Sequence, residues 1–153
     1  MIKVIIIGSG NVAQHLIVAF EKSKNEVSNV ALIQVFSRKR ETISHLLDYN
    51  RITTDYNQLL EADLYIIAVS DDVIVDVNSQ LPFKNRLVVH TSGTISLTAL
   101  SGENRTGVFY PLQTFTKYKE LDFKTIPICL ESEDTTDYQL LEKVAKSISN
   151  AIF

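Results

Sequence analysis

The sequence has 153 residues and contains one cysteine, one methionine and no tryptophan. The single cysteine, Cys129, cannot form a disulfide within the chain, which excludes a disulfide-stabilised fold. Cys129 lies in the apolar run Ile126-Pro127-Ile128-Cys129-Leu130, so we expect it to be a small buried core residue. A chain without disulfides fits a reducing compartment, and we expect a cytoplasmic protein.

Long apolar runs and an excess of positive charge are also missing. The longest apolar run near the start is far too short to cross a bilayer, and no signal-peptide pattern precedes it. Asp and Glu outnumber Lys and Arg by 18 to 15, which gives a net charge of −3 and an isoelectric point of about 5.6. This balance argues against general nucleic-acid binding, and we expect neither a nucleic-acid nor a membrane partner.

Several catalytic motifs are absent from the chain. The sequence shows no metal-ligand spacing, no nucleophile elbow and no phosphate-binding P-loop. We therefore expect no bound metal.

The most informative segment that is present joins a strand, a glycine turn and a helix near the N-terminus. The β-branched run Val4–Ile7 leads directly into Gly8-Ser9-Gly10-Asn11-Val12-Ala13, a G-x-G-x-x-A pattern. Gly8 permits a tight turn, Gly10 lets a pyrophosphate approach the backbone, and Ala13 lets the helix pack closely on the strand. The first helix amides lack intrahelical partners and suit an anion. The alternative is a tight turn that binds no nucleotide. The predicted pyrophosphate-binding residues are Gly8, Ser9, Gly10, Asn11 and Val12.

Apolar strands alternate with helical segments along the whole chain. This order predicts one domain, residues 1–153, with a doubly wound and mostly parallel α/β sheet of the Rossmann type and helices on both faces. The expected strands are 2–7, 30–37, 52–54, 63–69, 87–90, 107–110 and 125–131, and the expected helices or helical turns are 11–24, 39–49, 58–61, 72–80, 97–101 and 135–149. Residues 112–123 are expected to be irregular, and Asp134 is the expected N-cap of the last helix.

The end of the second strand predicts the choice of cofactor. An acidic residue at this place accepts a hydrogen bond from the ribose 2′-hydroxyl of NAD, but no acid occurs between Val27 and Lys39. Ser37 and Arg38 stand there instead, and a guanidinium can bind a 2′-phosphate in a bidentate manner. We therefore expect NADP(H), held by Ser37 and Arg38. Lys39 and Arg40 are equally well explained as solvated residues of the next helix.

Polar residues follow two further strands, where the nicotinamide half of a dinucleotide would lie. Ser70 and Asp71 follow one strand, and His90, Thr91 and Ser92 follow the next. We predict that these five residues face the nicotinamide and a substrate. His90 is the histidine candidate for the catalytic acid, and a purely structural role for it is the alternative.

Five motifs in this order resemble one family. The chain is similar to the Rossmann-like domain of NADP oxidoreductases that carry a second, helical domain, a family related to pyrroline-5-carboxylate reductase and 6-phosphogluconate dehydrogenase. The resemblance implies an NADP-binding oxidoreductase whose C-terminal helical domain forms a homodimer and closes the substrate pocket. The motifs are Ile7-Gly8-Ser9-Gly10-Asn11-Val12-Ala13, Ser37-Arg38, Ala68-Val69-Ser70-Asp71, His90-Thr91-Ser92-Gly93-Thr94 and Tyr110-Pro111-Leu112-Gln113-Thr114-Phe115.

The last residues of the chain look like the start of another strand. Ala151-Ile152-Phe153 is an apolar tripeptide after a helix and an Asn turn, whereas most domains end in a polar tail. We therefore expect the N-terminal part of a longer protein, without the helical domain that the resemblance implies. Such a chain is expected to bind the cofactor without turning over a substrate.

The predicted function is hydride transfer to or from a small molecule with a C=O or C=N group, with NADP as the cofactor. A non-catalytic module that senses dinucleotides is the alternative, because a fold does not determine a function. A methyltransferase-type domain for adenosylmethionine is a third hypothesis. That class prefers an acid at the second strand end, so Ser37-Arg38 argues against it.

Overall fold

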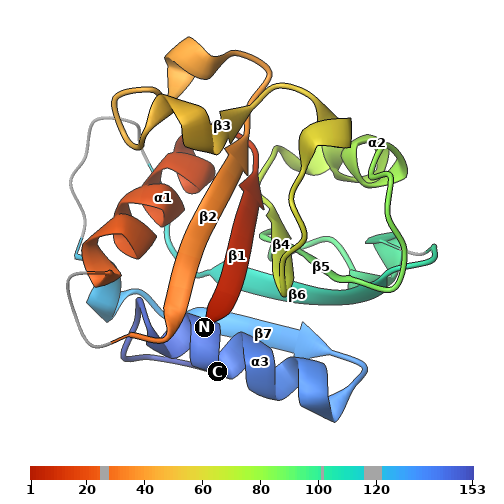
Figure 1. Ribbon diagram of the computed structural model, residues 1–153. Coiled ribbons are helices and arrows are strands. Elements are labelled where there is room, and N and C mark those ends of the chain that lie inside the picture. The colour runs from red at the N-terminus through yellow and green to blue at the C-terminus, as the bar shows by residue number, and fades with distance from the viewer. Residues whose placement is uncertain (25–27, 101, 116–121) are drawn as a thin grey trace.

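The computed structural model describes residues 1–24, 28–100, 102–115 and 122–153. These residues form a seven-stranded sheet with strand order β3-β2-β1-β4-β5-β6-β7 (Figure 1). All neighbouring strands are parallel except β6 and β7, which are antiparallel. The predicted doubly wound, mostly parallel α/β fold is confirmed. The strands are β1 (Ile2–Ile7), β2 (Val30–Phe36), β3 (Ile52–Thr53), β4 (Leu64–Ile67), β5 (Leu87–His90), β6 (Arg105–Pro111) and β7 (Ile128–Ser132), and the α-helices are α1 (Asn11–Ser23), α2 (Ile74–Ser79) and α3 (Thr135–Lys146).

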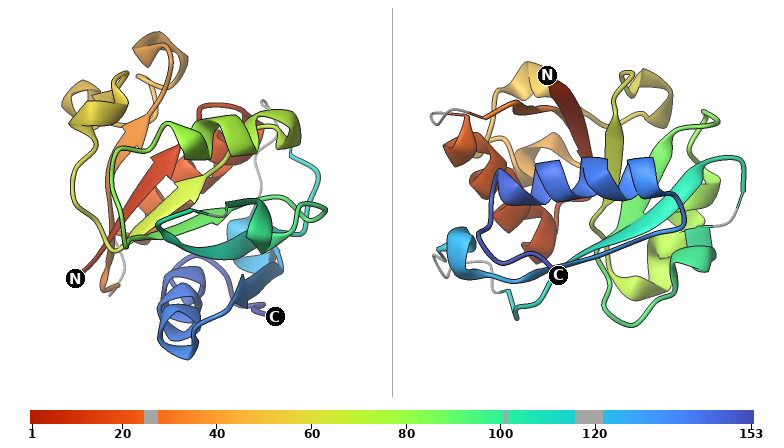
Figure 2. Two further views of the ribbon diagram at one scale, coloured as in Figure 1. Left: turned by 90° about the vertical axis from the view of Figure 1, so that its right-hand side faces the viewer. Right: turned by 90° about the horizontal axis from the view of Figure 1, so that it is seen from below.

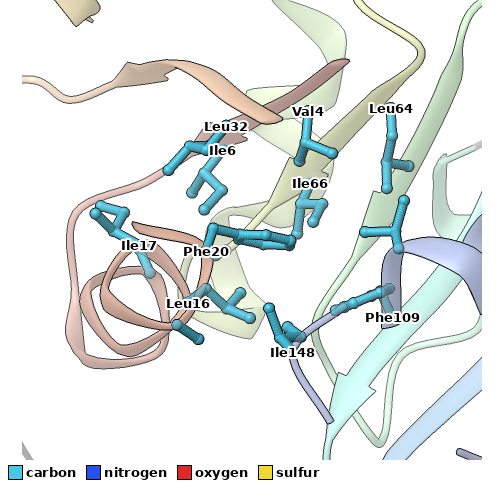
Figure 3. Close-up of a cluster of buried hydrophobic side chains, with 14 of the residues drawn as sticks. Val4, Ile6, Leu16, Ile17, Phe20, Leu32, Leu64, Ile66, Phe109 and Ile148 are labelled. Atoms are coloured by element: carbon cyan, nitrogen blue, oxygen red, sulfur yellow. The ribbon is translucent and has the colours of Figure 1, made fainter. Parts of the chain in front are cut away.

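Helices cover both faces of the sheet, as predicted. Figure 2 shows α2 and α3 on opposite sides of the strands. On the side of α1 and α3, Leu16, Phe20 and Ile148 pack against strand residues such as Ile6 and Ile66 (Figure 3). Alternate residues of the same strands face α2, which explains why β1 and β4 are apolar at every position of their central part.

The order of the strands produces a switch point between β1 and β4. The chain passes from β1 through α1 to β2 on one side, and β4 lies on the other side of β1. In open α/β sheets a ligand binds in the crevice at the carboxyl ends of the strands, at such a point. Helix α1 begins at this end of β1.

The helix predicted over residues 39–49 is wrong. The structure contains two short 3₁₀ turns there, η1 (Arg40–Thr42) and η2 (Tyr49–Arg51), separated by other turns. Ile43 and Leu47 are buried and stand four residues apart, a spacing that also occurs on one face of a helix. The β-branched and small polar residues of this segment have low helix propensity, and burial of these two anchors is achieved without a regular helix.

Several other boundaries differ from the prediction. The short helix expected at 58–61 is the 3₁₀ turn η3 (Tyr56–Gln58), and the helix expected at 72–80 starts as the 3₁₀ turn η4 (Asp71–Val73) before α2. The strand expected from residue 125 begins at Ile128, because 123–125 form the 3₁₀ turn η6. Asp134 caps α3, and its carboxylate accepts from the amide of Asp137 at 3.0 Å, as predicted. Residue 101 of the predicted turn 97–101 and residues 116–121 of the predicted irregular segment lie outside the described residues.

The last residues of the chain pair with the edge of the sheet. Ile152 forms a parallel bridge with Ile128, and the amide of Phe153 donates to the carbonyl of Ile128 at 2.9 Å. The prediction of extended structure at this position is confirmed. Cys129 is half-buried, so its assignment to the core is wrong, because it alternates along β7 with the inward-facing Ile128 and Leu130. Within the described ranges, no helix has the length and apolar character needed to span a membrane.

Candidate functional site

Gly8 fixes the end of β1 between its two neighbouring strands. Its φ is +139°, and a Cβ atom at this position would lie 2.1 Å from the carbonyl oxygen of Ala68, the residue after β4. On the other side, the Gly8 amide donates to the carbonyl of Phe36 at 2.9 Å. Glycine is therefore required by both the backbone conformation and the close approach of β4.

Gly10 leaves open space in front of α1. It has a φ of −81°, and a Cβ atom there would have no heavy atom of the described residues within 4 Å. Among the described residues no side chain caps α1, and its first turn contains no acidic residue. The unpaired amides and the positive end of the helix dipole are thus accessible to an anion. The residues present fit the pyrophosphate of a dinucleotide.

The neighbours of Gly10 hold the turn in shape. The Gln14 side-chain amide donates to the carbonyl of Ser9 at 2.9 Å, and the Asn11 side-chain amide donates to the carbonyl of Phe115 at 3.4 Å. The ring of Phe115 lies 5.0 Å from that of His15, one turn further along α1. The segment after β6 is therefore attached to the start of α1. Val12 is half-buried in the first turn.

At the end of β2, Ser37 and Arg38 have different surroundings. Ser37 is 1% exposed, and its hydroxyl donates to the carbonyl of Lys39 at 2.7 Å. Arg38 is exposed, and no hydrogen bond or ion pair joins it to the described part of the chain. Arg40 is occupied, because its Nε donates to the Ile52 carbonyl at 3.1 Å. Arg38 and Lys39 are thus the exposed cations of this turn, and the Arg38 guanidinium is the one that can bind a phosphate in a bidentate manner. Ser37 orders the turn that presents them.

An aromatic pair that the sequence analysis did not identify lies beside Arg38. The ring of Tyr56 stacks on Phe36 with 4.0 Å between centroids and 12° between planes. Burial raises the pKa of the Tyr56 hydroxyl, the Asp76 carboxylate raises it further, and the positive charge of Arg38 acts in the opposite direction. No motif signals this contact, because Phe36 ends β2 and Tyr56 belongs to the turn η3 after β3, and only the folded chain brings them together.

The turn after β4 contains the predicted residues Ser70 and Asp71. Both are exposed, and Ser70 directly precedes η4. The Asp71 carboxylate accepts from the hydroxyl of Thr94 at 3.0 Å. Asp71 is thus joined to the loop after β5, a contact that the sequence did not reveal.

His90 is fully buried at the end of β5. The amide of Ser92 donates to its Nδ1 at 3.0 Å, and its Nε2 lies 3.2 Å from the carbonyl of Ser96. Since Nδ1 accepts a hydrogen bond, Nε2 carries the proton and donates to Ser96. With both nitrogens engaged and no exposed surface, His90 is arranged to order the loop after β5. This arrangement favours the structural alternative over proton donation to a substrate.

Thr91 and Ser92 are also buried; the Thr91 hydroxyl faces β4, and the Ser92 hydroxyl faces its own loop. The Thr91 hydroxyl is 3.5 Å from the carbonyl of Ile67. The Ser92 hydroxyl accepts from the amides of Thr94 and Ile95 at 3.1 Å and 3.2 Å. The exposed residues of this loop are Gly93, Thr94 and Ser96. A Cβ atom at Gly93 would lie 2.5 Å from the ring of Tyr110 in β6, so this loop rests against β6.

These features define a Rossmann-type α/β domain with an open glycine turn at its switch point. Residues 3–93, more than half of the chain, match the family described as NADP oxidoreductase, coenzyme F420-dependent. The chain belongs to this family. No protein of curated function matched the sequence.

Comparison with solved structures gives the same fold. A Bacteroides fragilis protein provisionally named an NADP oxidoreductase, BF3122, is 32% identical, with a TM-score of 0.83 over 99% of this chain and 60% of that one. Pyrroline-5-carboxylate reductase from Coxiella burnetii is 17% identical, with a TM-score of 0.70 over 98% of this chain and 57% of that one. Prephenate dehydrogenase from A. aeolicus, in complex with hydroxyphenyl propionate and NAD+, is 12% identical, with a TM-score of 0.74 over 100% of this chain and 59% of that one. The chain therefore spans about 60% of the length of the structures it resembles.

Proposed function

We propose that the chain is the NADP(H)-binding part of an oxidoreductase. The dinucleotide would lie along the carboxyl ends of the strands, with its adenosine half over β2 and its nicotinamide half over β4 and β5. The observation that carries this proposal is the open space at Gly10, in front of an uncapped helix, with Arg38 exposed at the end of the adjacent strand.

Each part of the dinucleotide has a proposed partner. The backbone from Gly8 to Val12 would hold the pyrophosphate, and Arg38, presented by the turn that Ser37 orders, would hold the 2′-phosphate. The nicotinamide would lie beside Ser70, Asp71 and the loop that contains Thr91 and Ser92. When bound, the nicotinamide ring supplies or accepts the hydride, and the protein orients the ring and excludes water.

The choice of NADP over NAD depends on Arg38. No carboxylate stands at the end of β2 to accept from a free 2′-hydroxyl or to repel a 2′-phosphate. The description of the family names NADP, whereas the A. aeolicus dehydrogenase is in complex with NAD+. Because relatives of this fold differ in cofactor, the local charge at Arg38 is the stronger argument.

The proposed reaction is hydride transfer to or from a small C=O or C=N compound. Pyrroline-5-carboxylate reductase and an imine reductase from Streptomyces aurantiacus share the fold, which supports the C=N class. A non-catalytic dinucleotide sensor is the second candidate. The observation that favours it is the engagement of both His90 nitrogens inside the protein.

The experiment is a thermal-shift titration of the chain with NADPH, NADH and adenosylmethionine. A ligand that binds only the folded state raises the melting temperature in proportion to RT ln(1 + [L]/Kd). NADPH is expected to give the largest shift and NADH a smaller one. A shift with adenosylmethionine alone, or no shift with any of the three, would contradict the proposal.

A further inference from the structure

The loops after β4 and β5 are joined by a chain of hydrogen bonds that ends at Asp71. Thr94 Oγ1 donates its single hydrogen to the Asp71 carboxylate at 3.0 Å. The contact of 3.3 Å between the Ser92 and Thr94 hydroxyls must therefore use the hydrogen of Ser92. Ser92 Oγ in turn accepts from the amides of Thr94 and Ile95. All donors point toward the carboxylate, so each bond polarises the next.

This chain connects two strand ends that are adjacent in the sheet. Ile67 of β4 pairs with His90 of β5, and Asp71 and Thr94 lie at the same distance along the chain beyond these two residues. Ser70 and Asp71 of the first loop and Gly93 and Thr94 of the second loop are exposed. The Asp71–Thr94 bond thus fixes the separation of the two loops at the edge of the sheet where the nicotinamide half is proposed to lie.

A second contact joins the same loop to β6. Gly93 lies against the ring of Tyr110, so close that a Cβ atom would be 2.5 Å from two ring carbons. Below the loop, His90 accepts from the Ser92 amide and donates to the Ser96 carbonyl. The loop from Ser92 to Ser96 is therefore held by Asp71 in the turn after β4, by His90 of β5 and by Tyr110 of β6.

We infer that Thr94 is a positioning residue for the nicotinamide half of the cofactor, acting through Asp71. This inference rests on the proposed function. The hydroxyl of Thr94 is hydrogen-bonded to Asp71 and Ser92. It therefore affects a ligand through the conformation of the two loops and not by direct contact. Loss of the hydroxyl should free the loops while the glycine turn and Arg38, on the other side of the switch point, remain unchanged.

The test compares Thr94→Val with Thr94→Ser. Valine has the size of threonine but no hydroxyl, and serine keeps the hydroxyl; Thr94 is exposed, so both variants should fold. Calorimetry would measure binding of NADPH and of 2′-phospho-ADP-ribose, which has the same adenosine and pyrophosphate groups but no nicotinamide. Thr94→Val should weaken the affinity for NADPH by about three- to tenfold and leave the affinity for 2′-phospho-ADP-ribose unchanged. Thr94→Ser should bind both ligands as the parent protein does. The fluorescence of bound NADPH, which comes from the nicotinamide, should decrease in Thr94→Val alone.

Gly93→Ala provides an independent second variant. Its added methyl group must displace the loop or the Tyr110 ring, and the same nicotinamide-selective loss is expected. Equal losses for both ligands, or no loss of NADPH affinity in Thr94→Val, would overturn the inference. Failure of the parent protein to bind either ligand would instead contradict the proposed function itself, and the inference with it.

Discussion

At the scale of single residues, the two glycines of the turn have separate tasks. Gly8 is required by the fold, since its φ is positive and β4 leaves no room for a side chain. Gly10 has a negative φ and open space among the described residues, so the fold does not require glycine there, and its lack of a side chain fits the proposed pyrophosphate site. The G-x-G-x-x-A pattern predicts a tight turn at Gly8 and an open approach at Gly10, and the structure shows the backbone contact and the open space on which these two roles depend.

Gly10→Val is expected to abolish nucleotide binding in a folded protein. The branched side chain would occupy the space proposed for the pyrophosphate, while its effect at the helix N-cap costs about 1 kcal/mol of stability. Calorimetric titration with NADPH together with circular dichroism would measure both effects. A folded Gly10→Val protein with unchanged affinity would refute the site.

Gly8→Ala is expected to lower the stability of the fold, whereas Gly10→Val acts mainly on nucleotide binding. The methyl group would meet the backbone of Ala68 and the positive φ would be strained, so the free energy of unfolding should fall by on the order of 3 kcal/mol. Urea unfolding would measure this loss. Stability equal to that of the parent protein would show that the turn relaxes more easily than the structure indicates.

Arg38→Ala is expected to weaken NADPH binding by roughly ten- to hundredfold and to leave NADH nearly unchanged. The loss corresponds to one bidentate phosphate contact of about 1.5–3 kcal/mol. Lys39→Ala, the exposed cation next in the chain, is the matched control and should have a smaller effect. Equal losses for the two cofactors in Arg38→Ala would remove its assigned role.

At the scale of elements, an ion pair fixes the end of α1 to the β2–β3 edge. Both Nη atoms of Arg51 donate to the Glu21 carboxylate, at 3.1 Å and 2.5 Å, and Arg51 also donates to the carbonyl of Leu32. Burial alone would raise the pKa of Glu21, but the hydrogen bonds from Arg51 and Lys24 outweigh it, and the pKa lies below its ordinary value of 4.5. The charged pair therefore stabilises the fold at neutral pH.

Arg51→Met is expected to lower the free energy of unfolding by about 2 kcal/mol at pH 7. Because the folded-state pKa of Glu21 is lowered, its contribution is complete above 4.5 and is lost as the pH falls through the folded value. The difference in free energy of unfolding between Arg51→Met and the parent protein should thus become smaller in acid. Urea unfolding from pH 7 to below pH 4.5 would measure it. Lys84→Met breaks the exposed pair with Glu103 and should change stability much less, since both side chains are mostly solvated. A difference that stays constant below pH 4.5 would show that Glu21 is not its source.

The regular elements of this fold could be predicted from sequence, and its irregular ones could not. Buried parallel strands and the capped helix α3 have strong local signals, namely continuous apolar runs and the Asp134 cap. The segment between β2 and β3 has a helical spacing of Ile43 and Leu47 but turns instead, since tertiary burial decides its shape. In the candidate site, the positions of the strand ends follow from topology, whereas the Thr94–Asp71 bond and the Phe36–Tyr56 stack depend on side chains that only the folded chain brings together.

At the scale of the whole molecule, the proposed dinucleotide would meet its partners in a fixed order along the carboxyl edge of the sheet. The glycine turn stands at the switch point, Arg38 on the β2 side, and the Asp71–Thr94 bond on the β4 and β5 side. The chain spans about 60% of the length of its structural relatives. The imidazole of His90, the histidine candidate for the catalytic acid, is buried inside the protein.

We therefore expect the chain alone to bind NADPH without turning over a substrate. Hydride transfer needs the acceptor held against the nicotinamide and shielded from water, and neither nitrogen of His90 is available to it. A screen against small imines, ketones and keto acids, followed by nicotinamide absorbance, would measure turnover. Substantial turnover would show that this chain contains a complete active site.

The central claim is that the dinucleotide lies across the carboxyl ends of β2, β1, β4 and β5, and a crystal structure of the chain with NADP+ tests it most directly. The account predicts the pyrophosphate against the amides that follow Gly10, the 2′-phosphate at Arg38, and the nicotinamide beside Asp71 and the loop from Ser92 to Ser96. A dinucleotide bound elsewhere on the chain, or a 2′-phosphate that makes no contact with Arg38, would contradict it.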